Sequence, residues 1–286
     1  MTLEVRGFFH AQTFTVSYLV WEGESKRAAI IDSTLDFDQK SGHTGTVFAQ
    51  TILDAVEREG LKVDWILETH VHADHLTAAP FLKRATGAQV VIGAQVGIVQ
   101  SAFKPVFDAA DVSTDGREFD RLVGDGDELP LGGLQIKVMH TPGHTPACVS
   151  YVAGDAVFVG DTLFMPDYGT ARTDFPGGDA RSLYRSIRKI LSLPAQTRVF
   201  LCHDYKAPGR DAFVWETTVK AQRESNVHIH DGVSEDAFVA LREARDKTLE
   251  TPALLLPSIQ VNMRAGNLPP PDSNGVRYLK IPLDRL

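Results

Sequence analysis

Three histidines and an aspartate lie within six residues of one another, directly after the apolar run 63–69. A run of this length and composition is typical of a buried strand, so the polar cluster follows at the strand end. Residues two apart share one face of an extended segment, so His70 and His72 can face the same ion. The turn that follows brings Asp74 and His75 toward a neighbouring point. A solvated polar turn explains so many histidines poorly, and the spacing instead predicts two adjacent metal positions.

Three further candidate ligands lie in a turn or at the ends of later apolar runs. His144 lies in a Pro-Gly turn between two predicted strands, where Gly143 lets the backbone come close to the site. Asp161 ends one apolar run and His203 ends another. A polar group at the end of a buried strand is costly unless it has a partner, and a metal ion is a natural partner. The alternatives to a metal ligand are an ordinary turn residue for His144, a capping residue for Asp161 and a core residue for His203.

The rest of the pattern predicts an α/β fold in which strands and helices alternate through the first half of the chain. The length leaves one or two domains open, and we expect one domain over residues 1–286, with a short C-terminal extension from about residue 226. Strands are predicted at residues 14–21, 28–32, 63–69, 89–93, 135–139, 148–152, 156–159, 198–202 and 276–281. Helices are predicted at residues 46–59, 76–86, 182–191, 217–223 and 234–249.

Composition narrows the classes of partner. The 37 acidic residues outnumber the 29 basic ones, and no Lys- or Arg-rich run resembles a nucleic-acid footprint. No export signal and no membrane-spanning stretch is expected. Cys148 and Cys202 are expected to be buried and reduced, which favours a cytoplasmic protein.

The seven candidate ligands, in this order, resemble the metallo-β-lactamase superfamily over most of residues 10–205. That resemblance implies a four-layer αββα sandwich with its site at the strand ends between the two sheets. The segments 160–163, 171–175, 203–205 and 262–266 are similar to the glutathione persulfide dioxygenase, or sulfur dioxygenase, family. The short C-terminal tail also fits that family better than glyoxalase II, which carries a larger helical glutathione-binding domain. Ala171 departs from the glycine that relatives often carry.

This second resemblance implies one ferrous ion per chain, held by His70, His144 and Asp161. Two histidines and one carboxylate leave open coordination positions for substrate and dioxygen. The implied reaction oxidises glutathione persulfide with O2 to sulfite and glutathione, a step of hydrogen sulfide detoxification. The alternative is a zinc-dependent glutathione thioester hydrolase of the glyoxalase II type, because the same side chains can serve either metal. The other four candidates would orient the ligands or form a vacant second metal site: His72, Asp74, His75 and His203.

The two carboxylates of glutathione require local cations on this acidic protein. Arg172 is the first candidate, since it follows a Gly-containing loop near Asp161. Weaker candidates, for which a packing or solvated role is at least as well supported, are Tyr205, Lys206, Arg210 and Arg264. A lone His-x-His at residues 228–230 lacks further ligands nearby, and His140 is expected to be a core residue. A homodimer is compatible with the chain, because symmetric oligomers are common.

Overall fold

Two six-stranded sheets face each other in the computed structural model, which describes residues 2–285. The strands of the first sheet, in the order in which they pair, are β1 (Leu3–His10), β2 (Thr15–Glu22), β3 (Arg27–Ile31), β6 (Lys62–Leu67), β7 (Gln89–Gly93) and β8 (Arg121–Val123). Those of the second are β14 (Glu216–Thr218), β13 (Arg198–Phe200), β12 (Ala156–Phe158), β11 (Val149–Ala153), β10 (Leu134–His140) and β9 (Glu128–Leu131). A separate hairpin consists of β4 (Asp36–Asp38) and β5 (His43–Gly45).

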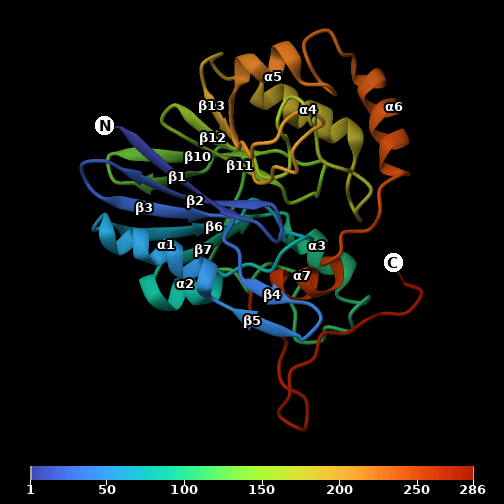
Figure 1. The fold of residues 1–286 in the computed structure, drawn as a ribbon. Coiled ribbons are helices and arrows are strands. Elements are labelled where there is room, and N and C mark those ends of the chain that lie inside the picture. The colour runs from blue at the N-terminus through green and yellow to red at the C-terminus, as the bar shows by residue number, and fades with distance from the viewer. Residues whose placement is uncertain (1, 286) are drawn as a thin grey trace.

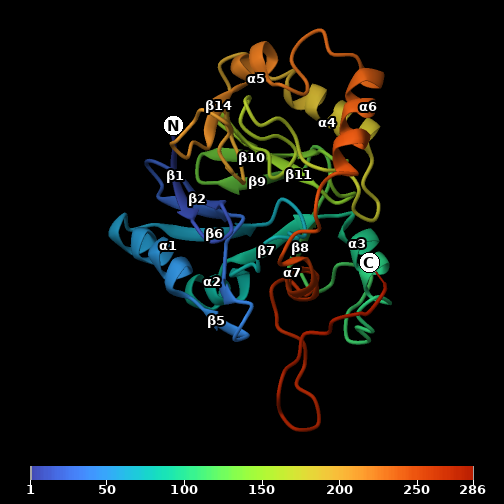
Figure 2. The same ribbon diagram turned by 45° about the vertical axis from the view of Figure 1, so that its right-hand side comes forward.

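Helices cover the outer face of each sheet, so that the molecule has four layers (Figures 1 and 2). The first sheet is covered by α1 (Val47–Arg58), α2 (Ala79–Thr86), α3 (Val96–Phe103) and α7 (Leu255–Asn262). The second is covered by α4 (Ala180–Ile190), α5 (Val219–Ser225) and α6 (Glu235–Asp246). This arrangement is the αββα sandwich that the sequence predicts.

Three apolar clusters fill the three interfaces between these layers. Along β2, Leu19 packs toward the helices of the first sheet, whereas the next residue, Val20, faces the second sheet. All eight residues of β2 are buried, because both faces of this strand are covered. Val199 of β13 faces the outer helices of the second sheet, while its neighbour Phe200 faces the first sheet. The site therefore rests on strands that are fixed from both sides.

Backbone hydrogen bonds join the two sheets at the end where the predicted ligands lie. The Val149 N–H donates to the Thr69 carbonyl over 2.9 Å, next to His70. The Val16 N–H donates to the Cys202 carbonyl over 2.7 Å, next to His203. These two bonds bring the ends of β6 and β13 to the same edge, although their residues are far apart in the sequence.

Several local predictions differ from the structure. No strand lies at residues 276–281, because this exposed segment runs outside both sheets and has no partner strand among residues 2–285. Residues 76–78 precede α2 instead of forming its first turn, and residues 216–218 pair with β13 as β14 before α5 begins. The sequence patterns did not reveal β1, α3 or α7. The first of these is a half-exposed edge strand, and the two helices have only eight residues each.

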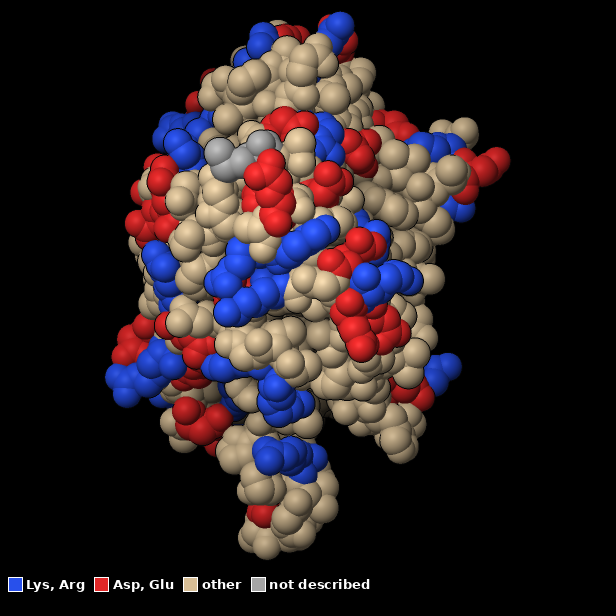
Figure 3. Space-filling model, turned by 90° about the vertical axis from the view of Figure 1, so that its left-hand side faces the viewer, with Lys and Arg blue, Asp and Glu red and all other residues tan. Residues whose placement is uncertain are grey.

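The surface beside the N-terminus carries charges of both signs. Figure 3 shows Lys and Arg side chains on this face lying next to Asp and Glu side chains. One ion pair, between Arg6 and Glu59 at 2.8 Å, links β1 to the residue that follows α1. No helix within residues 2–285 has the length and apolar character needed to cross a membrane.

Candidate metal centre

The structure brings all seven predicted ligands together in two groups. The first group is His70, His144 and Asp161, and the second is His72, Asp74, His75 and His203. Within each group, one ligand atom from each residue lies within 4.8 Å of every other. Asp161 lies between the groups. Its Oδ2 is 3.7 Å from His70 Nε2 and 3.6 Å from His144 Nε2, while its Oδ1 is 3.3 Å from His203 Nε2.

Several ligand atoms that face the centre of this cluster lack hydrogen bonds. Five of them are buried and make none: His70 Nε2, His72 Nδ1, His75 Nε2, His203 Nε2 and Asp161 Oδ1. An unsatisfied buried polar group costs about 1–3 kcal/mol, so native proteins rarely gather several of them in one place. A bound cation would give these imidazole and carboxylate lone pairs the partner they lack. The residues present therefore fit a metal ion.

Hydrogen bonds to one ring nitrogen of His144, His203 and His72 determine which nitrogen is left to bind a metal. His144 Nδ1 donates to the Arg172 carbonyl over 2.8 Å, and His203 Nδ1 donates to the Phe14 carbonyl over 3.2 Å. A carbonyl only accepts, so the lone pair of both rings is on Nε2. His72 is turned the other way, because its Nε2 lies 3.1 Å from Asp32 Oδ1 and Nδ1 is left facing the cluster. Such outer contacts orient ligands and tune a bound metal.

Sequence reasoning missed two buried carboxylates behind His72. Asp32 accepts the Thr69 N–H over 2.7 Å, and Glu68 accepts the Thr77 hydroxyl over 2.6 Å. Burial raises the pKa of Glu68. Burial opposes the charged form of Asp32 as well, but His72 and the Thr69 bonds lower its pKa overall. Asp32 follows an apolar strand, which is the same signal that identified Asp161, so it could have been found; Glu68 lies inside such a run.

Two glycines set the positions of ligands. Gly160 has φ +52°, and a Cβ there would lie 2.4 Å from the hydroxyl of Thr69, so only glycine lets Asp161 approach this strand end. Gly143 has φ +139°, and a Cβ on this residue would lie 2.3 Å from the backbone of Leu183 in α4. The expectation that Gly143 lets the backbone approach the metal ligands is thus wrong, because the tight contact is with the helix that supports the turn.

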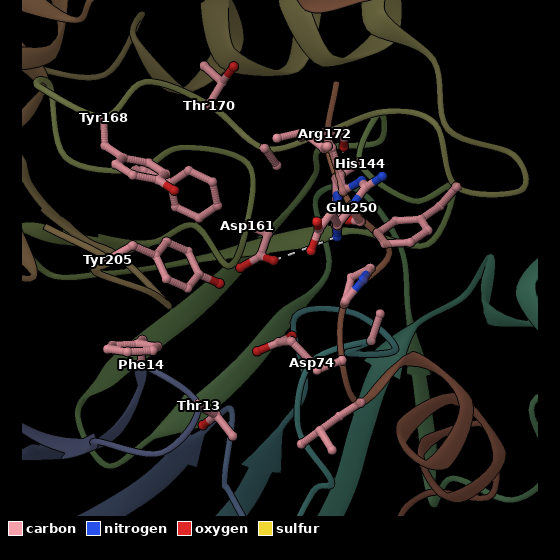
Figure 4. A pocket seen from close by; sticks show the side chains of 18 of the residues that line it. Thr13, Phe14, Asp74, His144, Asp161, Tyr168, Thr170, Arg172, Tyr205 and Glu250 are labelled. Carbon is pink, nitrogen blue, oxygen red and sulfur yellow. Dashed lines mark hydrogen bonds and ion pairs between the residues drawn. The ribbon is translucent and has the colours of Figure 1, made fainter. Parts of the chain in front are cut away.

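A cavity of about 440 Å³ opens beside the first group. Figure 4 shows Phe14, Tyr168 and Tyr205 on one side of Asp161, with His144, Arg172 and Glu250 on the other. The aromatic side is continuous, since the Tyr205 ring lies 5.5 Å from that of Tyr168 and 5.7 Å from that of Phe14. The opposite wall includes residues of α6 and of the segment 249–254 that follows it.

The predicted substrate-binding residues divide into two sets. Arg172 and Tyr205 line the cavity, whereas Lys206, Arg210 and Arg264 do not. Those three make contacts elsewhere: Lys206 lies over the ring of Phe213, Arg210 pairs with Asp204 and Asp167, and Arg264 pairs with Asp111. Arg242 and Arg245 of α6 also line the cavity, and the sequence analysis did not identify them.

Outside the site, other predicted features have ordinary roles. His228 is buried and its Nδ1 accepts the Thr170 N–H over 3.1 Å, and His140 Nε2 lies 2.9 Å from the Pro146 carbonyl. Cys148 and Cys202 are free and buried, as expected.

The fold and the metal-ligand cluster agree with the comparison to known families. The model of the metallo-beta-lactamase superfamily matches residues 11–203, and the chain belongs to this superfamily. It is 57% identical to a probable metallo-hydrolase of Burkholderia pseudomallei, over 99% of this chain and 100% of the relative. It is 46% identical to glyoxylase B2 of Dictyostelium discoideum, over 99% of this chain and 98% of that protein. The crystal structure of ETHE1 from Myxococcus xanthus aligns with a TM-score of 0.72 and 30% identity, covering 92% of this chain and 100% of that one.

Proposed function

We propose that this protein is an iron-dependent dioxygenase that oxidises glutathione persulfide to sulfite and glutathione. The observation that carries the proposal is the placement of the first group. Two of its three residues, His144 and Asp161, line the cavity, whereas in the second group Asp74 lines it and the three histidines do not. Together with His70, His144 and Asp161 form the two-histidine, one-carboxylate set that suits non-haem Fe(II) with open positions. The likeness to the Myxococcus ETHE1 structure supports the same assignment, because the mouse protein named persulfide dioxygenase ETHE1 is 29% identical over 93% of this chain.

The side chains around the cavity suit a reaction at a site of low polarity. Ferrous iron held by this ligand set would supply open positions for a persulfide and dioxygen. Phe14, Phe164, Tyr168 and Tyr205 form an apolar wall beside Asp161, which lowers the local polarity around the reacting sulfur. The hydrogen bond from His144 to the Arg172 carbonyl keeps the imidazole in its ligating orientation.

The overall reaction balances without a further cofactor. The sulfur–sulfur bond of the persulfide breaks, and the outer sulfur gives four electrons to dioxygen. Two oxygen atoms of sulfite come from dioxygen and the third comes from water, with release of glutathione and two protons.

The second candidate function is a zinc-dependent glutathione thioester hydrolase of the glyoxalase II type. The second group favours it, because His72, Asp74, His75 and His203 offer enough donors for another metal ion beside the first. Zinc supplies a hydroxide nucleophile at neutral pH. The similarity to glyoxylase B2 supports this reading too.

Metal analysis with an oxygen electrode separates the two. The protein is purified after growth with either iron or zinc, and each form is given glutathione persulfide and then S-lactoylglutathione. We expect about one iron per chain, oxygen uptake with the persulfide and an equal amount of sulfite. Two zinc ions with thiol release from the thioester and no oxygen uptake would replace the proposal by the hydrolase.

A further inference from the structure

The side of the cavity formed by α6 and the segment that follows it carries two charges without partners in the described chain. Arg245 and Glu250 both line the cavity and are exposed within it. Among residues 2–285, neither side chain forms an ion pair or a side-chain hydrogen bond, with each other or with a third residue. Most other arginines of this acidic protein pair with carboxylates, so the unpaired Arg245 and Glu250 leave two opposite charges available to a ligand in the cavity.

The other two arginines of the cavity are already occupied. The guanidinium of Arg172 binds Asp174 over 2.6 and 2.7 Å and the Glu250 carbonyl over 2.7 Å. Arg242 is buried and binds Asp246 over 2.7 Å and the Thr170 carbonyl over 2.9 Å. Both guanidinium groups therefore already have a carboxylate partner within the protein. Arg245 is therefore the free guanidinium of this cavity within the described chain.

The backbone of Glu250 is linked to a candidate metal ligand through Arg172. Arg172 donates to the Glu250 carbonyl from its side chain and accepts from His144 through its own carbonyl. The segment that carries Glu250 is thus connected by one residue to a candidate ligand. Figure 4 shows Glu250 near Arg172 and His144 on this side of the cavity.

We propose that Arg245 and Glu250 bind the α-amino acid head group of the substrate, the guanidinium holding its α-carboxylate and the carboxylate holding its α-ammonium. The inference rests on the proposed function, because glutathione carries such a zwitterion only at its γ-glutamyl end. The glycine end offers a carboxylate alone and leaves Glu250 without a partner. Two opposite charges that do not pair with each other match a ligand that carries both. The γ-glutamyl end then lies toward α6, and the persulfide sulfur points toward Asp161.

Calorimetric titration of the metal-loaded protein tests this assignment with two unreactive ligands. One is S-methylglutathione, and the other is N-acetyl-S-methylglutathione, in which the ammonium charge is removed and the carboxylate is kept. The wild-type protein is expected to bind the acetylated ligand about fivefold more weakly. Glu250→Gln should weaken S-methylglutathione about fivefold and abolish the difference between the ligands. Arg245→Gln should weaken both ligands by about the same factor.

Glu243→Gln and Lys247→Gln are matched controls, because both exposed residues lie on or directly after α6 but outside this cavity. They should bind both ligands as the wild type does. Equal binding of the two ligands by the wild type, or unchanged affinity in both cavity variants, would overturn the inference. If oxygen uptake with glutathione persulfide persists in that case, the proposed function stands alone. Ligand discrimination without oxygen uptake would support the inference and reject the dioxygenase. Absence of binding by either ligand would overturn both.

Discussion

The two groups of candidate ligands lie side by side but differ in their access to the cavity and in what supports them. His144 and Asp161 of the first group line the cavity, although His70 does not, and Asp74 of the second group lines it too. In the second group, His72, His75 and His203 are fully buried, and His72 is backed by Asp32 and Glu68. Carboxylates that contact the far side of a ligand orient it and tune a bound metal. The two groups therefore differ more in the support behind their ligands than in their access to the cavity.

The largest effect on metal binding and turnover is expected for Asp161→Ala. Asp161 contacts both groups, so its loss removes the one carboxylate of the first group and leaves three imidazoles without their acidic neighbour. We expect iron binding and turnover to fall together by about 100-fold or more. Metal analysis and the oxygen electrode measure this on the same preparation. Asp167→Ala is the control, since Asp167 pairs with Arg210 away from the cavity. Normal turnover in Asp161→Ala would refute the ligand assignment.

Asp32→Asn tests support from behind the cluster. The amide keeps the size of the side chain but removes the charge that faces His72 and the Thr69 N–H. Metal affinity is expected to drop by about tenfold, the usual loss when an outer partner of a ligand is changed. Competition with a chelator gives the affinity of each variant. An unchanged affinity would mean that Asp32 does not orient the cluster.

His203→Ala tests whether the first group holds iron without the second. If iron is held by the first group, the variant keeps about one iron per chain and loses only a few-fold in turnover, through the missing contact with Asp161. Metal content and turnover are measured separately for this reason. Loss of iron together with activity would instead place His203 in the iron site and merge the two groups.

The smallest effect is expected for His228, a buried histidine outside both groups. It shows how burial acts on a histidine that is not a candidate ligand. Burial, with Arg242 and Arg245 nearby, lowers the pKa of His228 from 6.5 to about 4. The unfolded chain therefore takes up a proton at a higher pH than the folded one. The stability that neutral His228 contributes is complete above pH 6.5 and is lost as the pH falls toward 4. In His228→Gln, the unfolding midpoint should decline less across this window, as followed by circular dichroism. Parallel declines in both proteins would contradict this.

The sequence predicted which seven side chains come together, because each lies at a strand end or in a tight turn, which short-range patterns reveal. Arg245 and Glu250 could not be found in this way. Arg245 reaches the cavity because α6 packs on α4, where Arg181 pairs with Asp236 and Tyr184 contacts Phe238. Glu250 lies in the segment after α6, whose backbone binds Arg172. Such packing leaves no local pattern. The alternating pattern at residues 276–281 predicted a strand that does not form. A strand also needs a partner strand, and a local pattern does not show whether one is present. The domain limit near residue 226 stays a prediction.

The meeting of candidate ligands from both sheets at one edge has a consequence for the stability of the fold. His70 and the three polar residues after it belong to the N-terminal half of the chain, and His144, Asp161 and His203 belong to the C-terminal half. An ion held between them acts as a cross-link between halves, and its binding free energy adds to the cooperativity of unfolding. Removal of the ion by a chelator should therefore lower the temperature at which the protein unfolds.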